Sequence, residues 1–403
     1  MRATRRIAGH VAAALIGAVT GGTIVLAIDG ATRDLPRRTR PNAVVTPFAA
    51  APKPAEIPSS AGKVLLAWTP GGLPAATERS LEKLRGVRDA TTVRAGLEWI
   101  ELSRADGSIV DRPSGGRAIP FEVAVIDPRE YARYVPPGER DAVLTLKPGE
   151  ALLAESAAKI RGAGRGLNLH LRGGPVEVVD VVSDVATQGY EALLVGDIAR
   201  TWARVDRFVL IQVTDRADRH AIQRTIGSFL APDQRLRIRA QGEVPFLRYG
   251  DAVLPQMVIK QHFGEFAAAP NSDGSIDIDP RWRRRNIAAA NVPILGRVTC
   301  HRALLPQLRD AMNALLGEGL GFTVDPSEYA GCHSARFIDA NPGGRLSHHS
   351  WGIAFDINVA SNAPGTRPDQ DPRLVEIMEE HGFTWGGRWL IPDGMHFEWV
   401  RFP

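Results

Sequence analysis

The sequence predicts a mixed α+β protein with two folded domains. Its 403 residues are too many for one ordinary domain and suit two folded units with attached segments. Hydrophobic residues make up 44% and charged residues 23%, which are proportions typical of a chain that folds. Strand-like apolar runs and helical patterns alternate after residue 62, so both kinds of element are expected.

Residues 1–28 are expected to form a cytoplasmic tip and a single-pass transmembrane helix. Arg2, Arg5 and Arg6 precede the segment 7–28, which contains no Asp, Glu, Lys or Arg. About 20 apolar residues suffice to span a bilayer as a helix. The segment ends in "LAIDG", without a small-x-small cleavage site, which favours an uncleaved anchor over a cleaved signal peptide. Both interpretations place the rest of the chain outside the cytoplasm, and the anchor would hold it at the cell membrane.

A linker is expected at 29–62. The stretches "DLPRRTRP" and "AAAPKPAEIPSSAG" are rich in Pro, Ala and small polar residues, which cannot bury a core and favour a semi-extended spacer.

The formal net charge of +4 comes mainly from scattered Arg. No recognition helix or aromatic-basic pattern accompanies this charge, so a nucleic-acid partner is not expected.

A small α/β or α+β accessory domain is expected at 63–240. Its strand-like runs are 63–68, 121–126, 176–182 and 207–213, and its helical patterns are 75–86 and 219–230. His170 and His220 stand alone, without a cluster of His, Cys or carboxylates. The stretch "LTLKPGEALLAESAAKIRGAGRGLNLHLRGGPVEVVDVVSD" loosely resembles extracellular domains of bacterial permeases of the lipoprotein-exporter type. We therefore expect a spacer, a regulator or a unit that binds an envelope protein.

The second domain is expected at 241–403. The segment 302–321 repeats apolar residues at helical spacing and is followed by glycine. A second helix is expected at 371–382, where Asp371 can cap the N-terminus and Pro372 occupies the first turn. The last segment, 395–402, is rich in aromatics and alternates as a strand does.

Histidines and carboxylates in this second domain suggest a metal site. In "SHHSWGIAFDIN" (347–358), either His348 or His349 could share a metal with Asp356, which lies on the presented face of a strand. His396, in "PDGMHFEW", is the expected third ligand. Catalytic zinc usually has three protein ligands from His and carboxylate and keeps a position open for water.

Two carboxylates compete for the role of general base. Asp393 precedes His396 by three residues in a Pro-Asp-Gly turn, where a carboxylate can lie beside a metal without binding it. Glu398 shares a strand face with His396 and is the alternative base, or a ligand or supporting residue. We favour Asp393.

The motifs "SHHSWGIAFDIN" and "DGMHFEW", preceded by "GCHSARFI", resemble the zinc D-alanyl-D-alanine carboxypeptidases of the vancomycin-resistance type. This group is related to lysostaphin-type peptidases and the hedgehog N-terminal domain. Its pattern is Ser-x-His, six residues, Asp, and later an acid, two residues and His. On this chain the pattern selects Ser347, His349, Asp356, Asp393 and His396, and His348 is one residue out of register.

The resemblance covers roughly 250–403 and implies an antiparallel sheet flanked by helices. It implies that His349, Asp356 and His396 bind Zn²⁺, that Asp393 is the base, and that Arg336 contacts substrate and steadies the oxyanion. Ser347 is expected to contact substrate too. Better-known members carry Glu at the position of Asp393, so this chain departs from their pattern with a shorter acid.

The expected activity is a zinc metallopeptidase that hydrolyses peptidoglycan stem peptides and removes a terminal D-Ala. Peptidases of this family that cut different bonds share the zinc, the base and the arginine. The first alternative is therefore an endopeptidase of the same family, and the second alternative is a non-catalytic peptidoglycan-binding module. A carboxypeptidase needs a cation for the substrate's free carboxylate. Arg336 and Arg345 are the candidates.

Cys300 and Cys332 are the two cysteines of the chain. Outside the cytoplasm an even pair favours a disulfide, whereas a zinc site with both thiols lacks the C-x-x-C spacing. The bridge would contribute on the order of 3 kcal/mol. It would also tether the loop of Arg336 to the scaffold.

Overall fold

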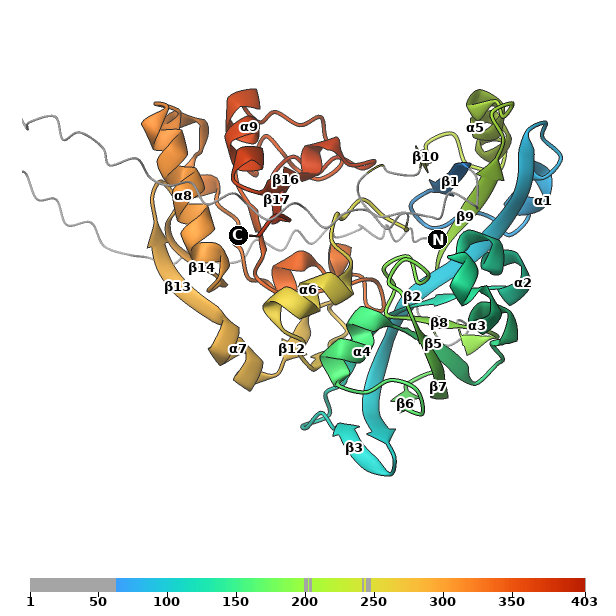
Figure 1. Cartoon of the computed structure of the whole chain (residues 1–403). Helices are drawn as coiled ribbons and strands as arrows, with labels where there is room; N and C mark the ends of the chain where they lie inside the picture. The colour runs from blue at the N-terminus through green and yellow to red at the C-terminus, as the bar shows by residue number, and fades with distance from the viewer. Residues whose placement is uncertain (1–62, 199–201, 203–204, 241–242, 244–247, 403) are drawn as a thin grey trace, which may run out of the picture. The chain divides into compact units, whose positions relative to one another are not determined.

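The computed structural model describes residues 63–198, 202, 205–240, 243 and 248–402 (Figure 1). The predicted anchor and linker, 1–28 and 29–62, lie outside these residues. Within the described ranges no helix is both long and apolar enough to cross a membrane. The mixture of sheets and helices confirms the α+β class.

The region predicted as the accessory domain, which keeps that name below, forms one large, mainly antiparallel sheet with the order β10-β1-β9-β2-β4-β8-β5-β7-β6, in which β3 and β6 also pair with β2. Two pairs, β4 with β8 and β5 with β7, are parallel. Its strands are β1 (Lys63–Trp68), β2 (Val87–Ala105), β3 (Ser108–Asp111), β4 (Ile119–Val125), β5 (Glu150–Ala154), β6 (Asn168–Leu171), β7 (Gly174–Val182), β8 (Ala192–Leu194), β9 (Asp206–Val213) and β10 (Arg237–Ala240).

In the described part of this domain the short α-helices are α1 (Thr77–Leu81), α2 (Pro128–Tyr131), α3 (Arg140–Thr145), α4 (Glu155–Arg161) and α5 (Arg219–Gly227). Asp127 and Asp218 cap α2 and α5 by accepting hydrogen bonds from backbone N–H groups. Ile222 and Ile226 of α5 pack with Leu81 of α1 against β1 and β9. The helix expected at 75–86 is therefore shorter than predicted, because the chain turns after Leu81 to enter β2.

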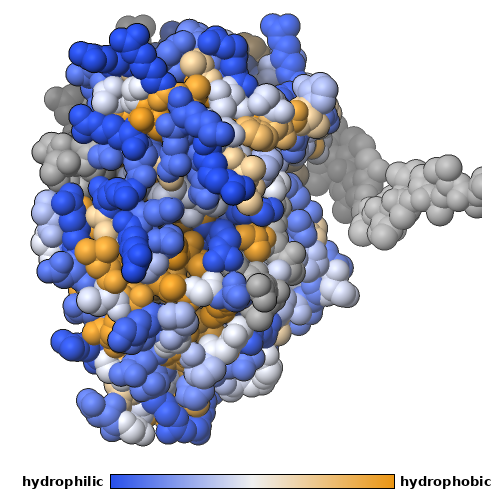
Figure 2. All heavy atoms as spheres, turned by 90° about the vertical axis from the view of Figure 1, so that its right-hand side faces the viewer, coloured by the Kyte–Doolittle hydropathy of each residue, from blue (hydrophilic) through white to orange (hydrophobic). Residues whose placement is uncertain are grey.

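The outer face of this domain is mostly hydrophilic. Figure 2 shows hydrophilic side chains surrounding apolar ones that gather near the middle of the view. Among the described accessory residues, Ile109, Leu144 and Phe229 are large apolar side chains that are exposed. Some exposed apolar side chains are normal on the surface of a folded protein.

The second domain carries small antiparallel sheets: β11 with β12, β13 with β14, and the order β15-β17-β16. Its elements are α6 (Gln256–Phe263), β11 (Ala268–Pro270), β12 (Ile276–Ile278), α7 (Pro280–Asn286), β13 (Ile287–Val292), β14 (Gly296–His301), α8 (Leu304–Gly317), β15 (Ala354–Asp356), α9 (Pro372–Glu380), β16 (Phe383–Trp385) and β17 (His396–Trp399). The helix α8 packs on the β13–β14 hairpin and on α9 (Figure 1).

The helix α9 follows its sequence signals closely. The Asp371 side chain accepts hydrogen bonds from the backbone of Arg373 and Leu374, and Pro372 starts the helix. Gly382, with φ of 84°, follows the last turn. The final strand is shorter than the predicted 395–402, because only His396–Trp399 pairs with neighbouring strands.

A continuous core joins the two parts, and all the residues that the structure describes fall in one compact unit. Trp99 of β2 lies in the same buried cluster as Phe266 and Phe337 of the second domain. Charges cross this interface as well: Lys260 Nζ lies 2.7 Å from Glu191 Oε2, and both side chains are fully buried. Removing one partner of such a pair would leave an uncompensated buried charge.

Candidate metal centre

Three potential metal ligands converge at one end of the β15–β17 ladder. The antiparallel register pairs Asp356 with His396, so their side chains lie next to each other on one face. His349 comes from a 3₁₀ turn, His348–Ser350, that immediately precedes β15. The ligand atoms of His349, Asp356 and His396 all lie within 4.8 Å of one another, and all three residues are buried.

The ring of His349 is oriented by a backbone carbonyl. Its Nδ1 lies 2.8 Å from the carbonyl oxygen of Cys332, so Nδ1 carries the proton and donates it. Its Nε2 then presents a lone pair, 3.1 Å from His396 Nδ1 and 3.3 Å from Asp356 Oδ2.

The ring of His396 is oriented by a carboxylate. Its Nε2 lies 3.2 Å from Glu398 Oε1, and its Nδ1 lies 2.9 Å from Asp356 Oδ1. When Nε2–H donates to Glu398, the lone pair of Nδ1 points toward that of His349 Nε2. Two nitrogen lone pairs and a carboxylate that face one another form a donor set that suits a cation. In metal-binding histidines, the other ring nitrogen usually donates a hydrogen bond to a carboxylate or a carbonyl, as it does here.

The electrostatics of the cluster also favour a positive charge. Burial alone would lower the pKa of His396, but hydrogen bonds with Asp356 and Glu398 outweigh it and raise the pKa to about 10. Burial alone would raise the pKa of Asp356, but hydrogen bonds with His349 and His396 hold it well below its usual range. Two nitrogens and one oxygen would leave one position open in a four-coordinate zinc site. The residues present therefore fit zinc.

His348 lies beside this cluster and outside it. Its Nδ1 is 2.9 Å from Glu398 Oε1, the same oxygen that His396 Nε2 contacts. Glu398 thus contacts two histidines. Burial would raise the pKa of this carboxyl, but the two histidines lower it well below its usual value.

Asp393 differs from Glu398 in its contacts. Among the described residues, Asp393 Oδ1 and Glu398 Oε2 are both buried without a hydrogen-bond partner. The difference is that Glu398 Oε1 contacts two histidines, whereas burial raises the pKa of the Asp393 carboxyl. The backbone is fixed nearby, since Asp393 N donates to Gly386 O at 3.0 Å and His396 N donates to Asp393 O at 3.2 Å. A carboxylate with a free oxygen and a raised pKa is suited to accept a proton.

Gly386 permits this close packing. A Cβ added there would lie 2.7 Å from Asp393 O and 3.3 Å from His396 Cβ. No other residue type fits beneath both side chains without a shift of the backbone.

The candidate ligands border a cleft with a cavity of about 200 Å³. His349, Asp393 and His396 line it together with Arg336 and Arg345. The ring of Trp389 also lies in this wall, with its centre 5.1 Å from that of His396.

The two arginines are held differently. Arg345 Nε lies 3.4 Å from Asp206 Oδ2, and its guanidinium lies 5.2 Å from the ring centre of Tyr249. Arg336 is fixed by its backbone: its N–H donates to Ser350 Oγ at 3.1 Å, and its carbonyl accepts from Ser347 N at 3.0 Å. In the part of the chain that the structure describes, the Arg336 guanidinium makes no ion pair. Arg336 is thus the more available cation.

Ser347 lines the same cleft, and its Oγ accepts a hydrogen bond from His349 N at 3.3 Å. This contact caps the turn that presents His349. A contact of Ser347 with substrate stays a prediction.

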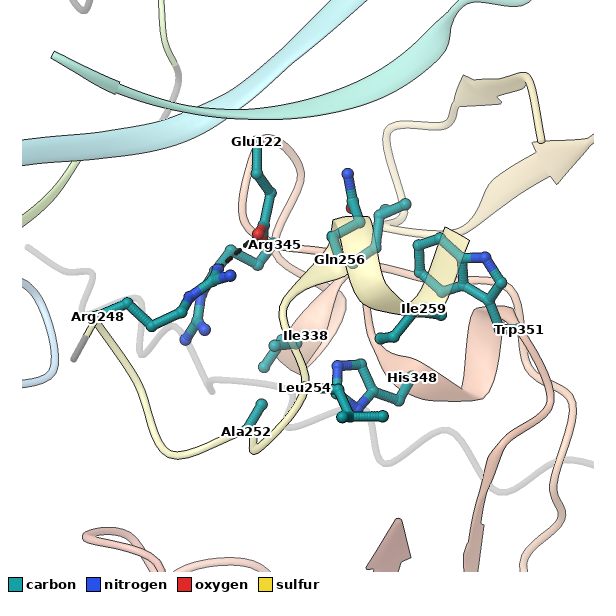
Figure 3. A pocket seen from close by; sticks show the side chains of 11 residues that line it. Glu122, Arg248, Ala252, Leu254, Gln256, Ile259, Ile338, Arg345, His348 and Trp351 are labelled. Atoms are coloured by element: carbon teal, nitrogen blue, oxygen red, sulfur yellow. Dashed lines mark hydrogen bonds and ion pairs between the residues drawn. The ribbon is translucent and has the colours of Figure 1, made fainter. Parts of the chain in front are cut away.

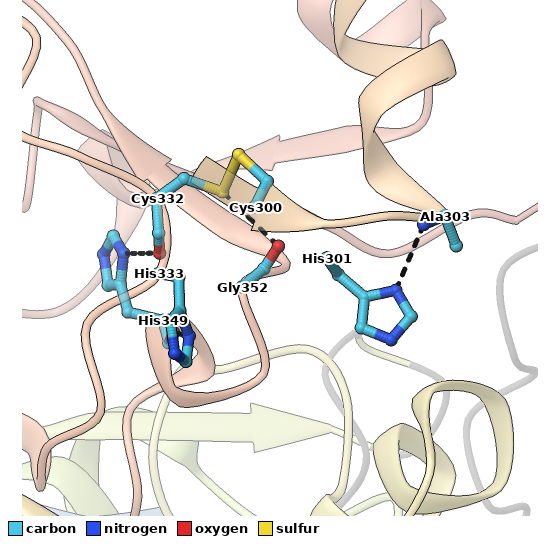
Figure 4. Close-up of a disulfide and its surroundings, with 7 residues drawn as sticks. All are labelled: Cys300, His301, Ala303, Cys332, His333, His349 and Gly352. Carbon is cyan, nitrogen blue, oxygen red and sulfur yellow. Dashed lines mark hydrogen bonds between the residues drawn. A yellow bond between two sulfur atoms is a disulfide. The ribbon is translucent and has the colours of Figure 1, made fainter. Parts of the chain in front are cut away.

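A disulfide joins Cys300, in β14, to Cys332, as expected for this pair (Figure 4). Because the Cys332 carbonyl accepts the Nδ1–H of His349, the bridge fixes the segment that orients this ring. His301 and His333 appear in the same view but do not belong to the ligand cluster.

Sequence reasoning missed the Cys332 carbonyl, Gly386 and Trp389. A carbonyl carries no sequence signal. The run "TWGGRW" does combine adjacent glycines with tryptophans, which is a pattern of close backbone packing that could have drawn attention to Gly386.

Residues 340–399 match the model of a family described as D-alanyl-D-alanine carboxypeptidase. This match confirms the resemblance for the C-terminal domain and supports a peptidase. It includes all three candidate ligands and Asp393, whereas Arg336 lies outside it. No curated protein matched the chain.

Two solved structures resemble part of the chain. One is the periplasmic region of MacB from Actinobacillus actinomycetemcomitans, with 12% identity over 46% of this chain and 90% of that chain, and a TM-score of 0.29. The other is a domain of a putative permease protein from Porphyromonas gingivalis, with 13% identity over 47% of this chain and 94% of that chain, and a TM-score of 0.30. We draw no conclusion from either.

Proposed function

We propose that this chain is a zinc-dependent peptidase that hydrolyses peptidoglycan stem peptides and removes their terminal D-alanine. The observation that carries the proposal is the convergence of His349, Asp356 and His396 beside Asp393 Oδ1, which has no described hydrogen-bond partner. In each imidazole, the nitrogen that would not bind the metal is already hydrogen-bonded. The family match at 340–399 supports the same class of reaction.

His349 Nε2, the Asp356 carboxylate and His396 Nδ1 would hold the zinc ion. When bound, zinc would polarise the scissile carbonyl and make the attacking water more acidic. Cys332 and Glu398 would keep the two imidazoles in the tautomers that binding requires.

Asp393 would act as the base. It accepts a proton as the water oxygen bonds to the carbonyl carbon, and it returns that proton to the nitrogen as the carbon–nitrogen bond breaks. Its raised pKa brings the carboxyl closer to the working pH and makes it a better proton acceptor than an exposed aspartate.

Arg336 would bind the free carboxylate of the substrate or the developing oxyanion, and Ser347 would contact the peptide beside it. A guanidinium can bind a carboxylate through two parallel hydrogen bonds. Because Arg345 is already paired with Asp206, Arg336 is the better candidate for this role.

We place this activity outside the cytoplasm on a single-pass anchor. The proposal rests on the uncharged segment 7–28, and the Cys300–Cys332 disulfide suits an oxidising compartment.

The test is digestion of purified muropeptides by the full-length chain loaded with zinc, followed by mass spectrometry. The expected product is a tetrapeptide, formed from a pentapeptide by loss of one alanine. Intact pentapeptides beside cleaved cross-linked dimers would indicate an endopeptidase. Bound but uncleaved muropeptides would indicate a binding module.

A further inference from the structure

The loop that carries Asp393 is bonded to the accessory domain. This segment, residues 386–393, is called here the base loop. Arg235 Nη1 donates to Leu390 O at 2.9 Å, and Arg237 Nη2 donates to Arg388 O at 3.3 Å. Arg237 is the first residue of β10, an edge strand of the large sheet.

A buried carboxylate strengthens this attachment. Asp251 Oδ2 accepts a hydrogen bond from Leu390 N at 2.7 Å. Its Oδ1 accepts from Arg239 Nη2 at 2.8 Å, and the Arg239 side chain in β10 is 2% exposed. One carboxylate therefore links the accessory sheet to the backbone of the base loop.

The accessory domain also forms part of the cleft wall. Its Trp68, at the end of β1, lines the cleft beside Tyr249 of the second domain, and the two ring centres lie 5.0 Å apart. Tyr249 OH donates to Thr69 O at 3.1 Å, and the Arg239 guanidinium lies 5.6 Å from the Trp68 ring centre.

The segment that contains Asp251 is held on its other side too. Gly250 has a φ of +90°, and a Cβ there would lie 2.5 Å from the guanidinium nitrogens of Arg345. Figure 3 shows Arg248 and Arg345 beside Glu122 of β4, and Arg248 Nη2 lies 2.5 Å from Glu122 Oε2. These contacts hold Asp251 in place, so it would not move together with the base loop.

We propose that the accessory domain positions the base loop. Asp251, a second-domain residue that Arg239 of β10 holds, is the positioning residue, and Arg235 and Arg237 of the accessory domain are supporting contacts. This inference rests on the proposed function and extends it to a role for residues 63–240 in the reaction. A base displaced by about 1 Å can lose on the order of 100-fold in rate. The zinc donors lie on β15, β17 and the turn before β15, outside the base loop.

The test compares three full-length variants: Arg235→Ala/Arg237→Ala, Asp251→Asn, and Arg219→Ala as a matched control. Arg219 is an exposed arginine of the same domain that bonds to the carbonyl of Ile238 and makes no described contact with the base loop. The measurements are zinc content, amide hydrogen exchange of residues 386–393, and kcat and KM for release of D-alanine.

We expect the double variant and Asp251→Asn to keep their zinc, to exchange faster in the base loop, and to lose kcat by on the order of 10-fold with little change in KM. Arg219→Ala should match the wild type. Unchanged exchange in the base loop of both variants would overturn the inference, as would faster exchange with a wild-type kcat. If the wild type releases no D-alanine, the proposed function fails, while the exchange data still decide whether the accessory domain holds the loop.

Discussion

The ligand strands β15 and β17 and the base loop 386–393 face the same cleft, but different contacts hold them. The strands are paired directly, with Asp356 opposite His396, and their supporting groups lie in the same domain. The base loop is bonded to Asp251, Arg235 and Arg237. Metal binding and proton transfer are therefore expected to respond to different substitutions.

The largest expected effect is on zinc content. His349→Ala removes one of three ligands and should abolish stoichiometric zinc, whereas His348→Ala should retain most of it, because His348 contacts Glu398 instead. Elemental analysis of the purified variants measures this. Equal zinc occupancy in the two proteins would contradict the assignment of His349.

The next effect separates the two acids. Asp393→Asn removes the proton acceptor and should lower kcat by on the order of 10² to 10⁴, with zinc retained. Glu398→Gln should instead weaken zinc binding by about 10- to 100-fold, because it alters the partner of His396 Nε2. Steady-state kinetics and zinc titration give both values. If only Glu398→Gln lost activity at saturating zinc, Glu398 would be the base.

Gly386→Ala tests the packing beneath the base. Its Cβ would approach Asp393 O to 2.7 Å, so the base loop must shift, and kcat should fall on the order of 10-fold to 100-fold. Gly317→Ala is the matched control, because a Cβ there meets no atom within 4 Å. Similar kinetics for the two variants would mean that the loop accommodates the methyl group.

The smallest expected effect on the reaction comes from the disulfide. Cys300→Ser/Cys332→Ser should lower the free energy of unfolding by about 3 kcal/mol, measured by denaturant titration. Zinc affinity should fall modestly, because the Cys332 carbonyl orients His349. Unchanged stability would show that the bridge does not constrain the unfolded chain.

Local patterns predicted much of this arrangement. The spacing of His349, Asp356 and His396 could be recognised because the motif lies on two short segments, and α9 could be predicted because Asp371 and Pro372 act within one turn. The contacts that distinguish Asp393 from Glu398 could not be predicted in the same way. They depend on which residues pack against each carboxylate in the folded chain. From the sequence alone, both acids therefore stayed candidates for the general base.

The role of the accessory domain was the least predictable part. Arg235 and Leu390 are 155 residues apart, and the bond between them involves a backbone carbonyl. Side-chain periodicity carries no information about such a contact. The shortened helix α1 has a similar cause, since β2 follows directly and must pair with β9.

The central claim is that one zinc ion at His349, Asp356 and His396 supports release of D-alanine. The most direct measurement is D-alanine release from a pentapeptide by the full-length chain, after complete removal of metal and then with increasing zinc. The account predicts that release stops on metal removal and returns in full at one zinc per chain, but not in His349→Ala. Release that persists in the metal-free protein would contradict it.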